Sequence, residues 1–263
     1  KYQPHLQAFA YVVKDKAKDA INRALLVEVL EEQYANIPAS DLVKQNIKLL
    51  AEASTFTVTA AHQPCLFMGP LYNIYKISCA VSLSIELKKE YPAYNFVPVF
   101  WMGSEDHDMD ELNHIAVGGN TLAWKGGSGA VGRLDAAIIA PVVESLKAQI
   151  GETEITQLLQ AGLRDYKSFG KLTQYFVNEL FKAHGLVVID QDDKKLKQCF
   201  TAVVKDEVFN KRAATVLKET VEYLENNYKA QAKPRDINFF YLGDGFRERI
   251  IADEAGGFKV NNQ

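Results

Sequence analysis

Residues 55–102 decide the fold, and they run TFTVTAAHQPCLFMGPLYNIYKISCAVSLSIELKKEYPAYNFVPVFWM. The β-branched and aromatic residues 55–60 predict a strand. Residues 71–90 carry apolar side chains at helical spacing and end in two lysines and a glutamate, which predicts an amphipathic helix. The apolar residues 96–102 predict a second, buried strand. Strand, loop, helix and strand in this order form the parallel βαβ unit of an α/β protein.

The segments around this unit add helices and further strands. Helical patterns are predicted for residues 24–34, 42–53, most of 141–184, and 194–227. A third buried strand is predicted at 186–190, short strands and turns at 115–140, and a β-hairpin at 237–251 around a Gly-Asp-Gly turn. We therefore expect an α/β fold with a parallel sheet flanked by helices and an added hairpin and helical segment.

The composition excludes several classes of protein. The chain has 263 residues, of which 48% are hydrophobic and 24% charged, and its net charge is −3, so it is an ordinary globular chain. No basic stripe predicts nucleic-acid binding, no apolar run reaches the ~18 residues of a membrane span, and no signal-peptide pattern is present. The three cysteines form no CxxC pair or disulfide framework, so a cytoplasmic location is expected.

Directly after the predicted strand 96–102 comes an unusually acidic segment, GSEDHDMDELNH at 103–114. It holds five carboxylates and two histidines. Mutual repulsion among so many acids is costly unless a cation, a metal, a proton or a substrate compensates it. Because ligands of open α/β sheets bind outside the carboxyl ends of the strands, this segment is a candidate site.

The spacing of these side chains argues against a calcium site and against a zinc site. A calcium loop that began at Asp106 would need glycine where Glu111 stands and glutamate where Val117 stands. The two histidines, His107 and His114, lack zinc-ligand spacing and a partner cysteine pair. A magnesium ion held by one or two carboxylates stays open, and no metal ligand is assigned.

General acid–base chemistry or substrate binding needs only proximity, and we favour it for the centre of the segment. The candidate catalytic residues are Glu105, Asp106 and His107. Asp108 is kept as a candidate binding residue. Asp110 and Glu111 are expected at a helix start, where acids offset the helix dipole. A carbohydrate hydrolase that uses paired carboxylates is an alternative.

The loop HQPCLFMGP at 62–70 is the second candidate site. Gly69 allows a ligand to approach the backbone, and the amino terminus of the following helix favours an anion, although a Gly-Pro pair that only starts the helix explains the sequence equally well. We favour a buried apolar role for Cys65 over a nucleophile activated by His62. Lys76 either meets an anion or is solvated.

One further motif, residues 127–132, formally matches GxGxxG. A dinucleotide fingerprint needs a strand before it and a long helix after it. Here the β-like pair Ile138-Ile139 and then Pro141 follow instead, so the motif is interpreted as a turn. No Walker loop is present.

Taken together, the motifs resemble one family. Residues 59–76, TAAHQPCLFMGPLYNIYK, and 97–114, VPVFWMGSEDHDMDELNH, resemble two signatures of the bacillithiol biosynthesis cysteine-adding enzyme, the BshC family. Further similar segments are VGRL at 131–134, LFKAHGLVVIDQDDKKLK at 180–197 and QAKPRDINFFYLGDGFRERI at 231–250. The chain differs from the family in having Ala61 where a glycine stands, and in lacking the second half of members about twice its length.

The resemblance implies a Rossmann-like core over residues 1–200 and a helical connector with a β-hairpin over 201–263. It implies addition of L-cysteine to glucosaminyl malate, the final step in making the thiol bacillithiol. ATP or another nucleotide would activate the carboxyl group. A homodimer would form through a carboxyl-terminal helical region absent from this chain. A non-catalytic half that binds sugar or nucleotide in a split enzyme is the alternative.

The resemblance also gives roles to individual residues. The candidate catalytic residues at 105–107 would orient the glucosamine amine and take its proton. His62 and Gln63 would bind polar groups of the malate or of an activated cysteine. Trp101 would form an apolar wall, and Asn73 a polar contact.

Overall fold

The computed structural model describes residues 2–229 and 233–260. The chain divides into two compact units, Lys1–Asp193 and Lys194–Gln263. This division falls just before the helix α9 (Lys194–Gln198), whereas the sequence places the end of the core at residue 200. No helix within the described residues has the length and apolar character needed to span a membrane.

The first unit is built on a parallel sheet of three strands in the order β1-β2-β5. Their bounds are β1 Thr55–His62, β2 Asn95–Met102 and β5 Val187–Asp190. Helix α4 (Tyr72–Glu90) connects β1 to β2, which confirms the predicted βαβ unit. The register aligns His62 with Met102 and Met102 with Asp190, so the three strands end at one edge of the sheet.

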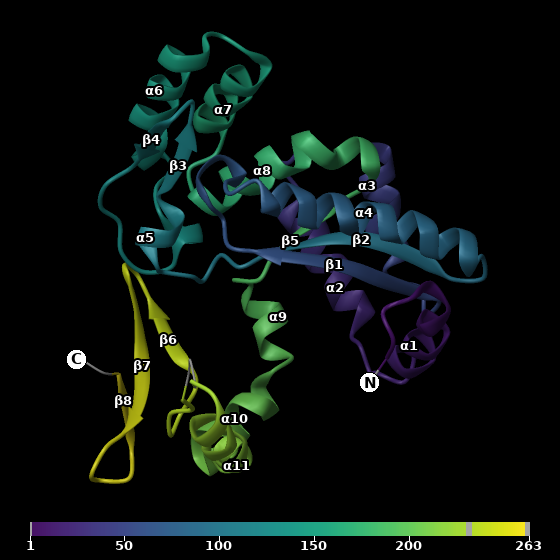
Figure 1. Ribbon diagram of the computed structural model, residues 1–263, viewed down its shortest axis with the longest axis vertical. Helices are drawn as coiled ribbons and strands as arrows, with labels where there is room; N and C mark the ends of the chain where they lie inside the picture. Colours follow the sequence, from purple (N-terminus) through teal and green to yellow (C-terminus); the bar gives the residue numbers. More distant parts are fainter. Residues whose placement is uncertain (1, 230–232, 261–263) are drawn as a thin grey trace. The chain divides into compact units, whose positions relative to one another are not determined.

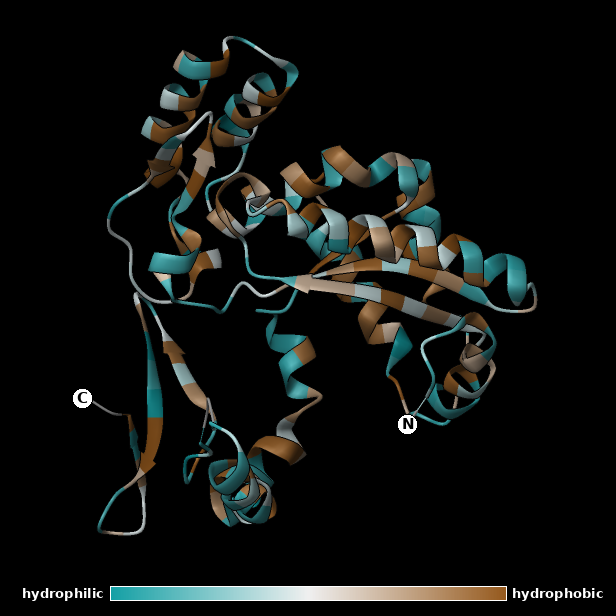
Figure 2. Ribbon diagram, viewed as in Figure 1, coloured by the Kyte–Doolittle hydropathy of each residue, from teal (hydrophilic) through white to brown (hydrophobic). Residues whose placement is uncertain are grey.

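Helices cover both faces of this sheet. The helices that pack against it are α2 (Arg23–Gln33), α3 (Asp41–Leu49), α4 and α8 (Phe169–Phe181). In Figure 1, α4 and α8 lie on one side of the sheet and α2 on the other. Strand β2 is apolar along nearly its whole length because it is the central strand, whereas α4 alternates apolar and polar residues (Figure 2). The core therefore lies between β2, β5 and these helices, with Phe100, Val187 and Val188 fully buried.

Side-chain caps explain where two of these helices begin. The Asn22 side chain accepts from the backbone N–H of Leu25 at 3.1 Å, one residue before α2. The Ser40 hydroxyl accepts from the backbone N–H of Val43 at 3.2 Å before α3. Such a cap contributes about 1 kcal/mol of helix stability. The remaining short elements around the sheet are η1 Leu6–Ala8, α1 Phe9–Lys16, η2 Leu66–Met68 and η5 Lys182–His184.

An insertion separates β2 from α8. It consists of α5 Met109–Leu112, β3 His114–Val117, β4 Asn120–Ala123, η3 Val131–Arg133, η4 Ala136–Ile139, α6 Ala140–Ile150 and α7 Glu154–Asp165. Short strands and turns are predicted in this segment, and β3 and β4 form an antiparallel pair there, with Gly118 and Gly119 at positive φ in the turn. The β-like interpretation of residues 138–139 is wrong, because the Asp135 side chain caps the short helix η4 by accepting from the Ala137 N–H at 2.9 Å.

The second unit contains helices and a three-stranded antiparallel sheet. Its elements are α9, α10 Thr201–Asn210, α11 Arg212–Asn227, β6 Phe240–Gly243, β7 Phe246–Ala252 and β8 Phe258–Val260. The predicted hairpin is confirmed, since Gly243 pairs with Phe246 across a two-residue turn. The helical stretch predicted at 194–227 is broken at Lys211, whose φ of 50° is left-handed.

Candidate active site

A pocket of about 710 Å³ with a largely apolar lining opens at the carboxyl end of β1. The loop after β1, the first turn of α4 and the start of the insertion form its walls. Its polar lining comes from His62, Gln63, Tyr72, Glu111 and His114. The pocket therefore lies where the topology of an open parallel sheet favours a ligand.

The hydrogen bonds of His62 fix the tautomer of its neutral ring. Nδ1 lies 3.1 Å from the carbonyl oxygen of Gln63, which can only accept, so Nδ1 carries the proton. Nε2 lies 2.8 Å from the hydroxyl of Tyr72 and is left to accept from it. Burial lowers the pKa of His62, and nearby Lys76 also lowers it, while the Gln63 carbonyl, Glu111 and Asp106 oppose this shift. His62 is therefore a neutral base with Nε2 on the Tyr72 side.

The same geometry argues against Cys65 as a nucleophile. Its Sγ lies 3.5 Å from Nδ1 of His62, the nitrogen that already donates to Gln63. Burial, with smaller contributions from Asp106 and Glu111, raises the pKa of Cys65 to about 12, although Lys76 opposes this shift. A thiolate is the reactive form, so the structure supports the buried apolar role.

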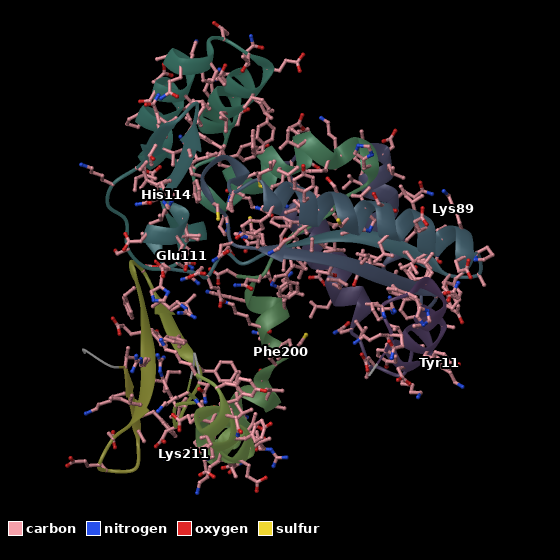
Figure 3. The ribbon with its side chains drawn as sticks, in the orientation of Figure 1. Tyr11, Lys89, Glu111, His114, Phe200 and Lys211 are labelled. Carbon is pink, nitrogen blue, oxygen red and sulfur yellow. The ribbon has the colours of Figure 1, made fainter. Side chains whose placement is uncertain are left out.

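Glu111 lies both at a helix start and in the pocket. It stands in the first turn of α5 with Asp110, as expected. Its Oε2 also accepts from Nε2 of Gln63 at 3.4 Å, and its side chain lines the pocket together with His114, which begins β3. Figure 3 marks both residues. The pocket thus receives a carboxylate that the sequence had assigned only to the helix dipole.

The candidate catalytic residues lie on the neighbouring loop, and none of them lines the pocket. Asp106 Oδ1 accepts from the N–H of His107 at 2.7 Å and of Asp108 at 3.2 Å, which shapes the turn that leads into α5. Nδ1 of His107 lies 3.9 Å from the same oxygen. Glu105 is half-buried. Asp106 reaches the pocket only through its charge, which acts on His62 and Cys65.

The other predicted binding residues have different surroundings. Gly69 lines the pocket, and a Cβ there would stand 3.0 Å from Cδ1 of Ile115, so the chain packs closely at this point. Asn73 is fully buried in α4, and its side-chain amide has no hydrogen-bond partner among the described residues. Trp101 is 40% exposed and donates from Nε1 to Gln191 at 2.8 Å, and it does not line the pocket.

A second polar cluster joins the ends of β2 and β5. The buried hydroxyl of Ser104 donates to Oδ1 of Asp190, which also accepts from the N–H of Asp192 at 2.9 Å. Burial raises the pKa of Asp190, while the Ser104 hydrogen bond lowers it. The sequence predicts the strand at 186–190, but Asp190 is not among the predicted site residues. The signal that could have found it is an acid at the carboxyl end of an otherwise apolar strand.

The glycine-rich segment that matched GxGxxG supports this loop rather than a dinucleotide. The N–H of Gly132 donates to the carbonyl of Ser104 at 2.9 Å, and the N–H of Val131 donates to the carbonyl of Asp106 at 2.7 Å. A Cβ on Gly132 would lie 2.5 Å from Cβ of Ser104. Nearby, Arg133 forms a two-pronged ion pair with Asp192. Over residues 2–229 and 233–260, no three or more His, Cys, Asp or Glu side chains are placed to hold a metal ion.

The fold and the pocket define a Rossmann-like α/β protein with a candidate active site at the carboxyl end of its parallel sheet. Residues 1–263 match the family described as "Bacillithiol biosynthesis BshC, N-terminal Rossmann-like domain". The chain belongs to this family, which confirms the resemblance of its motifs.

Curated relatives share the family name "Putative cysteine ligase BshC". The Flavobacterium johnsoniae protein is 41% identical over 266 residues, which cover 98% of this chain and 50% of that protein. The Cytophaga hutchinsonii protein is 41% identical over 251 residues, covering 95% and 47%. The Bacillus anthracis protein (strain CDC 684 / NRRL 3495) is 29% identical over 273 residues, covering 95% and 49%. The chain thus spans about half the length of these relatives.

Proposed function

We propose that this chain forms the amino-terminal part of a cysteine ligase that joins L-cysteine to glucosaminyl malate in bacillithiol biosynthesis. The observation that carries the proposal is the pocket at the end of β1. It places a neutral histidine, a tyrosine hydroxyl and a carboxylate together on motifs of the BshC family. The names of the relatives support a ligase; the two substrates are part of the proposal.

The chemistry of amide formation matches these groups. The amine nitrogen attacks the carbonyl carbon of an activated cysteine, the C–N bond forms, and the bond from that carbon to its leaving group breaks with its electron pair. The amine must also lose a proton. Nε2 of His62 is unprotonated and half-buried, and it accepts from the Tyr72 hydroxyl. The amine proton would therefore pass to the Tyr72 oxygen as the Tyr72 proton passes to Nε2, so that His62 is the base and Tyr72 the relay. The carboxylate of Glu111 would hold the amine as an ammonium ion before it is deprotonated.

The neighbouring loop has a supporting role in this proposal. Glu105, Asp106 and His107 would orient the amine-bearing sugar at the rim, because their loop leads directly into α5 and hence to Glu111. Gln63 would bind a polar group of the malate. Turnover that is unchanged by His107→Ala in a full-length enzyme would remove His107 from the mechanism.

The pocket is poorly suited to a nucleotide that would activate the cysteine carboxyl. Among the described residues, no lysine or arginine lines it, and Glu111 adds negative charge, so it does not fit a triphosphate. The pocket is better suited to the amine and hydroxyl groups of the sugar. We therefore assign the sugar to this pocket, and no step proposed for it involves a nucleotide.

The test is a ligation assay with cysteine, glucosaminyl malate and ATP, using a full-length enzyme that carries these 263 residues. We expect His62→Gln to lower turnover by about 10²- to 10⁴-fold, the usual contribution of a general base. The matched control is His184→Gln, because His184 is exposed and lies outside the pocket. Equal turnover in both variants would contradict the proposal.

Calorimetry with glucosaminyl malate on the 263-residue chain separates the ligase from a binding half. Turnover of cysteine and glucosaminyl malate by the full-length enzyme identifies it as the ligase. Binding by the chain without turnover by the full-length enzyme would instead identify a non-catalytic half.

A further inference from the structure

Strand β1 is an edge strand with an open outer side. Its one partner among the described strands is β2. On that inner side, the carbonyls of Ser54 and His62 accept from Asn95 N–H at 3.0 Å and from Gly103 N–H at 2.8 Å. Backbone groups alternate between the two sides of a strand, so the even-numbered residues face β2 and the odd-numbered residues face outward.

The middle of this outer side has unused hydrogen-bonding groups. The carbonyl of Thr55 accepts from Arg23 at 3.0 Å, and the carbonyl of Ala61 accepts from Lys76 at 3.5 Å. Between them, the backbone N–H and C=O groups of Thr57 and Thr59 have no partner within the described chain. Natural proteins protect such an edge with charges, prolines or bulges. The sequence TFTVTAAH at 55–62 has none of these, so it is suited to pairing.

Two grooves flank the same edge, one on each face of the sheet. On the α4 face, a groove of about 690 Å³ lies between residues 58–61 and the exposed side chains of Tyr75 and Cys79. On the opposite face, an apolar groove of about 360 Å³ lies between Phe56 of β1 and α1, with Phe9 in its wall. A strand that pairs with β1 would bring side chains to both faces of the sheet. These side chains, and the helix connected to the strand, would fill the two grooves.

The topology identifies what such a strand would be. The order β5-β2-β1 is the 3-2-1 half of a doubly wound sheet. In the complete fold a fourth strand pairs in parallel with the first, and ligands bind at the switch point between these two strands. His62 ends β1 at that point. The chain also matches an amino-terminal domain and spans about half of its relatives' length, so the required polypeptide exists in the family.

We propose that the open edge of β1 binds a parallel strand from the polypeptide that follows the matched region in full-length members of the family. The apolar side chains next to that strand fill the two grooves. Its carboxyl end then lies beside His62 and adds a wall to the pocket. The inference rests on the edge, the grooves and the strand order, and it holds whichever reaction the pocket performs.

Amide hydrogen exchange, resolved to single residues, tests this pairing directly. The two samples are the 263-residue chain and a longer chain, in which these residues continue into the unmatched carboxyl-terminal half of the Flavobacterium johnsoniae relative. We expect the outward amides of Thr57 and Thr59 to exchange at least about 100-fold more slowly in the longer chain. The inward amides of Phe56 and Val58 should be protected in both samples and serve as internal controls.

Two results would overturn the proposal. One is fast exchange of Thr57 and Thr59 in both samples. The other is protection in the shorter chain that grows with its concentration, because that would show a second copy on the edge.

A variant pair gives an independent measure of the same contact. The two halves are produced as separate chains, and their association is followed by calorimetry. Thr57→Pro removes an outward N–H and leaves the bonds to β2 in place, whereas Thr57→Val keeps the N–H. We expect Thr57→Pro to weaken association at least about tenfold and Thr57→Val to leave it nearly unchanged. Equal association of both variants overturns the proposal, and if Thr57→Pro does not fold, the exchange experiment decides.

Discussion

Cys65 shows that burial, more than a nearby histidine, sets the reactivity of a thiol. Its pKa of about 12 leaves roughly one thiolate in ten thousand at pH 8. We expect iodoacetamide to modify the exposed Cys79 and Cys199 of the 263-residue chain at pH 8 and to leave Cys65 unmodified until the chain is unfolded. Peptide mass spectrometry measures the modification at each site.

The matching functional prediction concerns Cys65→Ala. This variant should keep turnover in a full-length enzyme within about threefold of the parent, because no step of the proposed reaction uses the thiol. A loss of turnover without a loss of stability would restore Cys65 as a nucleophile.

His62 should make stability depend on pH. Its folded-state pKa lies below the unfolded value near 6.5, so the unfolded chain binds the proton more readily. Its contribution to stability is complete above about pH 6.5 and is lost as the pH falls through the unfolded pKa toward the folded one. We expect urea midpoints to fall between pH 7.5 and 5.5, and to fall less in His62→Gln. An equal fall in both proteins would contradict the lowered pKa.

The residues of the pocket were predictable only in part. The family motifs contain His62, Gln63 and Gly69, and all three line the pocket. Tyr72 lies in the same motif, yet its role depends on a 2.8 Å contact across the first turn of α4, which spacing alone does not give. Glu111 was assigned to the helix start because sequence shows that an acid begins a helix but not which way its side chain points.

At the scale of elements, the loop after β2 depends on one glycine. Gly132→Ala would place its Cβ 2.5 Å from Cβ of Ser104 and 3.1 Å from the Ser104 carbonyl oxygen. Because Ser104 is fully buried and cannot move aside, we expect a loss of about 1–3 kcal/mol in the free energy of unfolding, measured by urea denaturation.

Gly103→Ala is the matched control in the same loop. A Cβ there meets nothing closer than the His62 carbonyl oxygen at 3.6 Å, an ordinary contact. Its free energy of unfolding should stay within about 1 kcal/mol of the parent. Equal losses in the two variants would show that the Gly132–Ser104 contact does not hold the loop.

Elements with strong periodicity were predictable, and their interruptions were not. The strands of the sheet and helix α4 follow from β-branched runs and helical spacing because burial selects the same residues in sequence and structure. The break of the last helical stretch at Lys211 and the short helix at 136–139 depend on single contacts. The Glu207 carboxylate accepts from Ala213 N–H at 2.8 Å just beyond the break, and Asp135 caps the short helix. Such local contacts leave no periodic signal.

The two units of the molecule differ greatly in their cores. The first buries apolar residues from all three strands and from the helices on both faces of the sheet. In the second, only Glu207 and Ile237 are buried among residues 194–229 and 233–260, while Phe200, Phe209 and Tyr223 are exposed. Since apolar burial is the main source of stability, the first unit should be much the more stable.

Removing residues 194–263 should therefore leave the first unit folded. All hydrogen bonds of the parallel sheet lie within residues 1–193, so we expect a cooperative urea transition within about 1 kcal/mol of that of the same unit in the 263-residue chain. Intrinsic fluorescence suits the measurement, because both tryptophans, Trp101 and Trp124, belong to the first unit. In the 263-residue chain, amides of 194–260 should exchange faster than those of β2. If the truncated chain shows no cooperative transition, the second unit stabilises the sheet. Its contribution would then be larger than its few buried residues suggest.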